Sequence, residues 1–264
     1  MTPYIEENFL GSYRIKLDPS FVLDRHIIEK GVCELPIVQL INKFVRPGAV
    51  CVDVGANAGY HTLAMAGAVG ASGHVYAFEP NEITFSKLKE NLELNSSLRA
   101  RVTCEKLGLS SESGELKVFQ AGEEAGNAYV SAEYNERFWN GGTPDDYSIC
   151  KVVRLDSYIN SDKKVSFIKA DVEGMELEVL MGADALLKRD KPVILFETLL
   201  ENFNHEKIKK LEEYLRSLDY LILGIDPDTG MLTQVGYPNF GSDSLAITRS
   251  QLEEFNIPLV EGAK

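Results

Sequence analysis

The sequence is poor in the residues on which several kinds of site depend. Its 264 residues include four cysteines and four histidines, with no C-x-x-C pair and no metal-like histidine spacing. Lys and Arg total 27 against 40 Asp and Glu, and the net charge of -13 argues against a nucleic-acid partner, because phosphate contacts need clustered cations. No apolar run approaches the ~18 residues of a membrane span, and the first residues lack the layout of a signal peptide. Since free thiols fit a reducing compartment, we expect a cytoplasmic protein without a membrane partner.

The dinucleotide fingerprint is also missing, although the turn that would carry it is present. Residues 49–54 form a short apolar run that predicts a buried parallel strand, and Gly55 and Gly59 follow it in a tight turn before a small-residue helix. A pyrophosphate site needs G-x-G-x-x-G, whereas Asn57 stands in place of the second glycine. This turn therefore predicts a nucleotide-like ligand that lies against backbone and has no pyrophosphate.

Two acidic residues indicate what that ligand carries. Asp53 lies inside the strand before the turn, where it would repel a phosphate and suit a positive charge. Glu79 ends the next apolar run, at a position where a carboxylate can accept both hydroxyls of a ribose. A cationic ligand with a ribose and no pyrophosphate is S-adenosylmethionine, which we predict as the cofactor.

Three blocks of sequence resemble one known family. D-V-G-A-N-x-G-Y-H-T, V-Y-A-F-E-P-N and F-I-K-x-D-V-E-G-x-E-x-x-V-L-x-G-A occur in this order between about residues 46 and 200, and together they resemble the FkbM family of S-adenosylmethionine-dependent methyltransferases. The resemblance implies a Rossmann-like class I methyltransferase fold of the α/β class. We therefore expect a seven-stranded, mostly parallel sheet with helices on both faces and an antiparallel last strand at residues 245–248.

The order of apolar patterns agrees with an alternating α/β core. Strands are predicted at 50–54, 74–79, 101–106, 165–170, 192–197 and 219–225, and helices at 60–69, 81–95, 175–188 and 204–218. We expect an N-terminal helical extension over 1–46, which forms either a wall for the substrate or a packing addition. The methyltransferase domain is expected over 47–250 with an insert at about 108–150, and a C-terminal tail over 251–264. The insert's aromatic residues, Tyr129, Tyr134, Phe138, Trp139 and Tyr147, either contact an acceptor or fix the loop to the core.

The predicted site gathers at the carboxyl ends of the strands, where open α/β sheets bind ligands. The predicted cofactor-binding residues are Asp53, Gly55, Asn57, Gly59, Glu79, Leu107, Gly108 and Asp171. The predicted bases are Asp171, Glu173 and His61, the last kept neutral by the helix that begins there. Asp171, Glu173 and Glu197 could offer oxygens to Mg²⁺, but no D-x-D or histidine pair supports this, and we predict no metal.

We expect transfer of a methyl group to a hydroxyl of a sugar, glycan or secondary metabolite, by analogy with the family. One alternative is an N-methyltransferase acting on a small molecule or glycoconjugate. Another is a non-catalytic S-adenosylmethionine-binding protein. The broken fingerprint argues against a nicotinamide-dependent oxidoreductase. A homodimer is possible, and nothing in the sequence commits to it.

Overall fold

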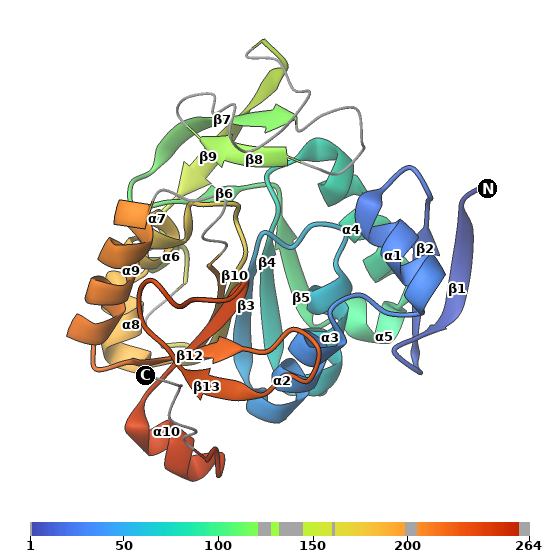
Figure 1. The fold of residues 1–264 in the computed structure, drawn as a ribbon. Helices are drawn as coiled ribbons and strands as arrows, with labels where there is room; N and C mark the ends of the chain where they lie inside the picture. The colour runs from blue at the N-terminus through green and yellow to red at the C-terminus, as the bar shows by residue number, and fades with distance from the viewer. Residues whose placement is uncertain (1, 121–127, 132–144, 160–161, 199–204, 259–264) are drawn as a thin grey trace.

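The computed structural model describes residues 2–120, 128–131, 145–159, 162–198 and 205–258, and an eight-stranded sheet forms its centre (Figure 1). The strands in spatial order are β13 (Leu232–Gln234), β12 (Leu221–Ile225), β14 (Asp243–Ile247), β11 (Val193–Glu197), β10 (Val165–Ala170), β3 (Val50–Val54), β4 (His74–Phe78) and β5 (Val102–Glu105). Along the chain, these strands follow one another in the order that the sequence predicted for the Rossmann-like core.

The sheet differs from the expectation in the number of strands. The five strands from β11 to β5 are mutually parallel, whereas β14 runs antiparallel to both β11 and β12. The antiparallel last strand was predicted. The prediction of seven strands was wrong, because β13 pairs with β12 across a short turn and adds an eighth. Strand order reverses between β3 and β10, so the ligand crevice of such a sheet is expected there.

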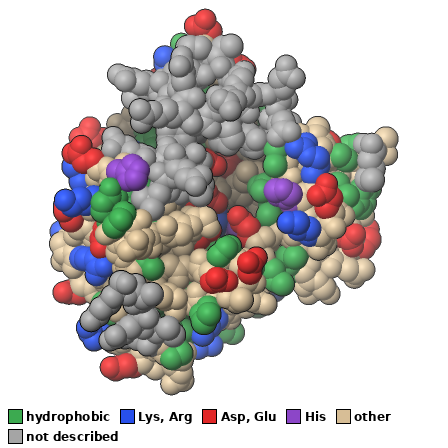
Figure 2. Space-filling model, in the orientation of Figure 1, with side chains coloured by type: hydrophobic (Ala, Val, Ile, Leu, Met, Phe, Trp, Pro, Cys, Tyr) green, Lys and Arg blue, Asp and Glu red, His purple; other side chains and the backbone are tan. Residues whose placement is uncertain are grey.

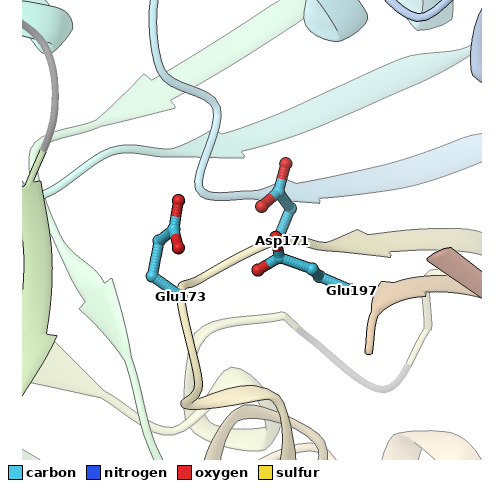
Figure 3. A group of neighbouring side chains, drawn as sticks. All are labelled: Asp171, Glu173 and Glu197. Atoms are coloured by element: carbon cyan, nitrogen blue, oxygen red, sulfur yellow. The ribbon is translucent and has the colours of Figure 1, made fainter. Parts of the chain in front are cut away.

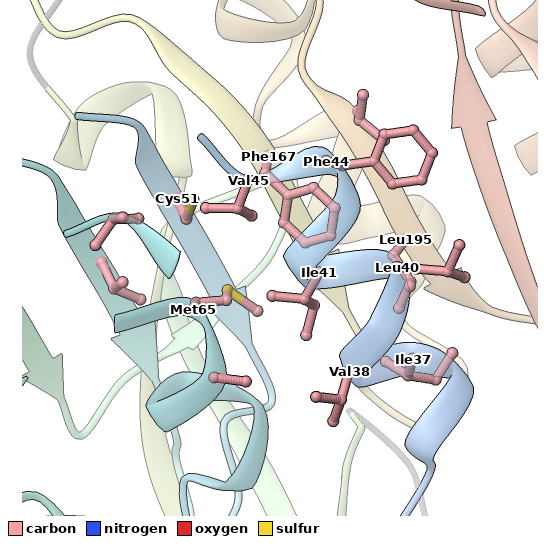
Figure 4. Packing of buried hydrophobic residues seen from close by; sticks show 14 of the residues in the cluster. Ile37, Val38, Leu40, Ile41, Phe44, Val45, Cys51, Met65, Phe167 and Leu195 are labelled. Atoms are coloured by element: carbon pink, nitrogen blue, oxygen red, sulfur yellow. The ribbon is translucent and has the colours of Figure 1, made fainter. Parts of the chain in front are cut away.

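Helices cover both faces of the main sheet, and its strands alternate between the two cores that result. In β11, Val193 and Leu195 join one core, while Ile194 and Phe196 join the other. The first core packs α2 (Leu35–Phe44), α3 (Tyr60–Ala68) and α4 (Glu82–Leu94), and the second packs α6 (Leu155–Tyr158), α7 (Glu176–Met181), α8 (Asp184–Asp190) and α9 (His205–Ser217). Figure 4 shows the apolar side chains of α2 against β3, β10 and β11. In the described part of the chain, no helix has the length and apolarity needed to cross a membrane.

Two predicted segments differ in detail from the structure. The single helix expected at 175–188 is two helices, α7 and α8, with Gly182 between them. A Cβ at Gly182 would lie 2.1 Å from the carbonyl oxygen of Ser110, so this position has no room for a side chain. The expected tail at 251–264 is packed as far as the structure describes it. Its first residues belong to α10 (Arg249–Glu254), and Leu252 and Ile257 are buried in the first core.

The N-terminal segment is a hairpin followed by two helices. Strands β1 (Tyr4–Phe9) and β2 (Tyr13–Leu17) pair antiparallel, and α1 (Val22–Lys30) and α2 follow. Asn91 of α4 and Asn95, the residue directly after α4, hold the hairpin. Their Oδ1 atoms accept from the amides of Lys16 (2.8 Å) and Arg14 (2.9 Å). The Nδ2 atom of Asn91 also donates to the carbonyl of Ala58 at 2.8 Å, which links the hairpin's support to the glycine turn.

The insert forms a second sheet with the order β6 (Gly108–Leu109), β9 (Tyr147–Val153), β7 (Gly114–Gln120) and β8 (Ala128–Ser131). It follows α5 (Ser96–Arg99) and β5 in the chain, and it precedes β10, as predicted. Figure 1 shows it beyond one end of the main sheet. Tyr147 is exposed, whereas Tyr134, Phe138, Trp139 and the side chain of Tyr129 lie outside the described part, and their predicted roles remain predictions.

Candidate functional site

A cleft of about 330 Å³ opens at the carboxyl ends of β3, β4, β10 and β11. Its walls come from the glycine turn after β3, from the N-terminal segment through Leu23 and Glu34, and from the second sheet through Ala128 and Val130. Figure 2 shows the hollow near the middle of this face with acidic side chains around it. The cleft therefore lies at the switch point of the sheet and includes residues from both additions to the core.

The glycine turn is required by the packing of the chain itself. Gly55 has φ +77°, and a Cβ there would lie 1.8 Å from the carbonyl oxygen of Asp171. Gly59 has φ +91°, and its Cβ would meet the Cδ1 atom of Leu88 at 2.6 Å. Gly55 and Asn57 line the cleft, whereas Gly59 begins α3 behind it. Gly55 and Asn57 can therefore contact a cofactor in the cleft, as predicted. Gly59 does not line the cleft and serves only to shape the turn.

Glu79 closes the turn from the side of β4. Its Oε2 atom accepts from the amide of Asn57 and its Oε1 atom from the amide of Asn81, both at 2.8 Å. The side chain lines the cleft and is 6% exposed. Burial raises the pKa of Glu79 against the effect of these backbone hydrogen bonds. The side chain of Thr84 gives a third hydrogen bond. A carboxylate has about four lone-pair sites, so Glu79 remains able to accept from a ligand.

A buried lysine joins two of the predicted acidic residues. Lys169 lies directly opposite Asp53 in the pairing of β10 with β3, and its Nζ atom is 2.9 Å from Asp171 Oδ2 and 3.9 Å from Asp53 Oδ1. Asp53 is fully buried outside the cleft and accepts from the hydroxyl of Thr62 at 2.5 Å. Burial favours the neutral amine of Lys169, but the two carboxylates outweigh it and raise its pKa. Sequence reasoning quoted Lys169 within a motif and gave it no role.

The loop after β10 presents Glu173 to the cleft in a strained conformation. Glu173 has φ +53° and Gly174 has φ +97°, and a left-handed backbone is costly for a residue with a side chain. The Oε1 atom of Glu176 accepts from the amides of Val172 (3.0 Å) and Gly174 (3.3 Å). Glu176 is 4% exposed, and it fixes the loop that carries Glu173. It was read from the sequence only as part of the motif.

We expect Glu176→Ala to lower the free energy of unfolding by about 1–3 kcal/mol, because two loop amides lose their acceptor in a buried place. Glu176→Gln keeps a side-chain carbonyl oxygen, so its loss is expected to stay below about 1 kcal/mol. Urea unfolding of both variants measures the difference. Equal stability of the alanine and glutamine variants would remove the loop-fixing role.

His61 and Glu34 face each other across the cleft wall. His61 is 8% exposed, and burial, aided by Lys169, lowers its pKa to about 3. The neutral form was predicted from the helix start, and burial is its main cause. His61 Nε2 lies 3.3 Å from Glu34 Oε2 but makes no hydrogen bond. Glu34 precedes α2 with φ +49°, and the sequence analysis did not single it out.

Three carboxylates from neighbouring strand ends converge in the cleft (Figure 3). Oxygens of Asp171, Glu173 and Glu197 lie within 4.8 Å of one another. Burial and the nearby Asp171 raise the pKa of Glu173 to about 8 and that of Glu197 to about 11. For Asp171 itself, burial favours the neutral carboxyl, but the Lys169 ammonium outweighs it and holds the pKa below its usual value. The structure thus brings together the residues that the sequence analysis considered for magnesium.

Leu107 and Gly108 lie beside the cleft rather than in its wall. They line a small apolar hollow of about 20 Å³, which shares Gly55, Pro80 and Val172 with the cleft. A Cβ at Gly108 would lie 2.9 Å from Val152 Cγ1, so this glycine serves the pairing of β6 with β9. Their predicted contact with a cofactor remains a prediction.

Comparison with known proteins gives consistent matches. Residues 53–222 match the methyltransferase FkbM domain. The chain is 31% identical over 164 residues to the hexuronic acid methyltransferase AglP of Haloferax volcanii, covering 61% of each chain. It is 29% identical over 147 residues to methyltransferase 1 of Beauveria bassiana, covering 50% of this chain and 57% of that protein. The chain thus spans about three fifths of the length of these relatives. The crystal structure of methyltransferase FkbM from Methylobacillus flagellatus aligns with a TM-score of 0.48 and 20% identity, over 79% of this chain and 50% of that one.

Proposed function

Because the chain belongs to the FkbM family of S-adenosylmethionine-dependent methyltransferases, we propose that it methylates a hydroxyl group of a sugar, glycan or secondary metabolite. The name of the Haloferax volcanii relative, a hexuronic acid methyltransferase, supports a sugar as the acceptor. The N-methyltransferase and the non-catalytic binding protein remain the alternatives that product analysis would distinguish.

The observation that carries this proposal is the shared cleft. Glu79 at the end of β4 and the three predicted bases, Asp171, Glu173 and His61, line the same space. The donor set fits S-adenosylmethionine, since the carboxylates of this cleft suit a ligand with a sulfonium and an ammonium group. When bound, the cofactor supplies a methyl group on a positively charged sulfur. Glu79 is suited to hold its ribose, and Gly55, Asn57 and Asp171 to hold its methionine part.

Asp53 supports the cofactor site indirectly. It is fully buried and does not line the cleft. Its carboxylate helps to hold the Lys169 ammonium, which in turn orients Asp171 at 2.9 Å. We assign Asp53 a positioning role in place of a direct contact with the cofactor.

Glu173 is the base that the electrostatics of the cleft favour. A base must take a proton from the acceptor hydroxyl, and its pKa should lie near the working pH. The pKa of Asp171 is held low by Lys169 and that of His61 is about 3, whereas the pKa of Glu173 is raised to about 8. In this proposal Glu173 accepts the proton and His61 orients the acceptor, while Asp171 holds the methionine part of the cofactor.

Glu79→Ala is expected to weaken binding of S-adenosylhomocysteine about 10- to 100-fold, since a charged hydrogen bond contributes roughly 1.5–3 kcal/mol. Isothermal titration calorimetry on the wild type and the variant measures this. Glu82→Ala is the matched control, because Glu82 lies at the exposed start of α4 and pairs with Lys106 at the surface. A cooperative thermal unfolding transition is the check that the Glu79 variant is folded. If folded Glu79→Ala binds S-adenosylhomocysteine as tightly as the wild type does, Glu79 does not hold the ribose. If the folded wild type does not bind it, the chain does not use S-adenosylmethionine as proposed.

A further inference from the structure

A buried ion pair outside the cleft joins the N-terminal segment to the core. Asp24 of α1 is fully buried, and Lys87 of α4 is 6% exposed. The Nζ atom of Lys87 donates to Asp24 Oδ2 and lies 4.0 Å from the centroid of the Phe21 ring. The hydroxyl of Tyr60, the first residue of α3, donates to Asp24 Oδ1. One carboxylate of the N-terminal segment thus binds side chains from two helices of the core, and the proposed reaction uses neither of the two charges.

The same segment packs against the glycine turn. A small third core holds its buried apolar side chains, and Ala58 and Tyr60 are the buried residues of this core that come from outside the segment, among the residues that the structure describes. The rings of Tyr60 and Phe9 meet edge to face with their centroids 6.1 Å apart. The turn that offers Gly55 and Asn57 to the cofactor therefore runs directly into the surface on which the N-terminal segment lies.

The hydrogen bonds of Asp24 determine which side of α1 faces the cleft. Leu23, its neighbour in the chain, lines the cleft together with Tyr60. Apolar packing is not directional, whereas hydrogen bonds need defined distances and angles. The bonds from Asp24 to α3 and α4 therefore fix the rotation of α1 about its axis. Because apolar residues of similar volume often stabilise a fold as much as a buried ion pair does, the distinct contribution of this pair is orientation.

We propose, on the basis of the function proposed above, that Asp24 is a positioning residue for the methyl acceptor. Through Lys87 and Tyr60 it holds the N-terminal wall of the cleft in one place relative to the cofactor turn. Glu34 of this wall lies 3.3 Å from His61, which orients the acceptor in the proposed reaction, so the wall borders the acceptor's part of the cleft. Movement of the wall should weaken acceptor binding and leave the transfer step nearly unchanged.

An apolar replacement of all three groups separates orientation from stability. The triple variant Asp24→Leu, Lys87→Met, Tyr60→Phe keeps similar side-chain shapes and removes both charges, so its urea midpoint should stay within about 0.5 M of the wild type. Asp24→Asn alone leaves the Lys87 ammonium without its partner charge and should lower the midpoint by about 1–2 M. Amide hydrogen exchange, measured by mass spectrometry, should be about tenfold faster in α1 of the triple variant than in the wild type.

Exchange at the wild-type rate in α1 of the triple variant would overturn the proposal, because the network would then act on stability alone. If the triple variant loses more stability than expected, Tyr60→Phe makes the same comparison, since it removes one hydroxyl and no charge. Its α1 is expected to exchange about threefold faster than that of the wild type. An unchanged rate in this variant would equally contradict the role of Asp24.

Steady-state kinetics test the role toward the acceptor, with the methyl glycosides of glucose and glucuronic acid and radiolabelled S-adenosylmethionine. For whichever glycoside the wild type methylates, the triple variant should have a KM about tenfold higher and a kcat within about threefold. Its affinity for S-adenosylhomocysteine, measured by calorimetry, should also stay within about threefold. An unchanged acceptor KM, or a loss confined to S-adenosylhomocysteine affinity, would overturn the proposal. If neither glycoside is methylated, the exchange rate of α1 decides it.

The exposed pair of Lys16 and Glu90 is the matched control, because it also joins the N-terminal segment to α4. Lys16→Gln with Glu90→Gln is expected to change neither the exchange rate of α1 nor the acceptor KM, and an equal change would overturn the assignment to Asp24. A failure of the proposed function gives a different pattern, in which the wild type does not bind S-adenosylhomocysteine. The exchange rate of α1 then still decides whether Asp24 positions the wall.

Discussion

Replacement of Glu173 by glutamine is expected to lower kcat about 10²- to 10⁴-fold, the range that a positioned base contributes. Glutamine keeps the size of the side chain and cannot take a proton from the acceptor. Binding of S-adenosylhomocysteine should remain, because Glu173 is proposed to act on the acceptor. Steady-state rates and calorimetry on the same preparation measure the two effects.

The pH dependence of the rate tests the assignment of Glu173 as the base. The pKa of Glu173 is raised to about 8, so its carboxyl is mostly protonated at pH 7 and becomes available as the pH rises. We therefore expect kcat/KM of the wild type to rise through pH 8, and this rise to be absent in Glu173→Gln. His61→Phe serves for comparison and should keep the rise at lower activity, whereas Asp171→Asn should move the rise to lower pH, because the Asp171 carboxylate helps to raise the pKa of Glu173. Full activity in all three variants would refute a base among these residues.

Replacement of Lys169 by methionine is expected to lower the free energy of unfolding by about 3–5 kcal/mol, because it leaves buried charge without its partner. Lys169 is 3% exposed, and Asp53, its neighbour across the strand pair, is fully buried. Methionine fills a similar volume, so most of the loss should come from the charge. Urea denaturation at pH 7 provides the measurement.

A double variant tests the cause of this loss. Asp53→Asn combined with Lys169→Met removes the buried charge of Asp53 along with its partner, and part of the stability should return. Lys188→Met is the control, since Lys188 forms an exposed pair with Asp184 in α8, and such pairs contribute about 0–1 kcal/mol. If Lys169→Met and Lys188→Met cost the same, the buried ion pair does not stabilise the fold.

The sequence predicted the core best where local pattern and packing agree. The apolar run at β3 and the glycines after it are dictated by local chain geometry, so the strand, turn and helix were predicted correctly. The three-residue strand β13 carries too few residues for a pattern, and it forms only because β12 offers an unpaired edge. Gly182 divides one predicted helix in two through a contact with Ser110, more than seventy positions away in the chain.

The sequence predicted the site residues that lie next to the strand ends. It missed residues whose place in the site depends on strand pairing, on a tight loop or on the packing of a distant helix. The role of Lys169 could have been predicted from the sequence. It is a charged residue in an apolar strand, two residues before Asp171, and residues two apart in a strand lie on the same face. Glu176 has the spacing of an ordinary helix-surface residue, and only the tight loop buries it. Glu34 reaches the cleft through the placement of α2, which no local pattern encodes.

The asparagine contacts between the hairpin and α4 also set an order of events during synthesis. Arg14 and Lys16 leave the ribosome 81 and 75 residues before Asn95 and Asn91, the residues that bind them. At about 5–20 residues per second, the hairpin waits roughly 4–16 s for its support. The hairpin therefore docks only after α4 has been made, and the wall that carries Leu23 and Glu34 is added to the cleft after that.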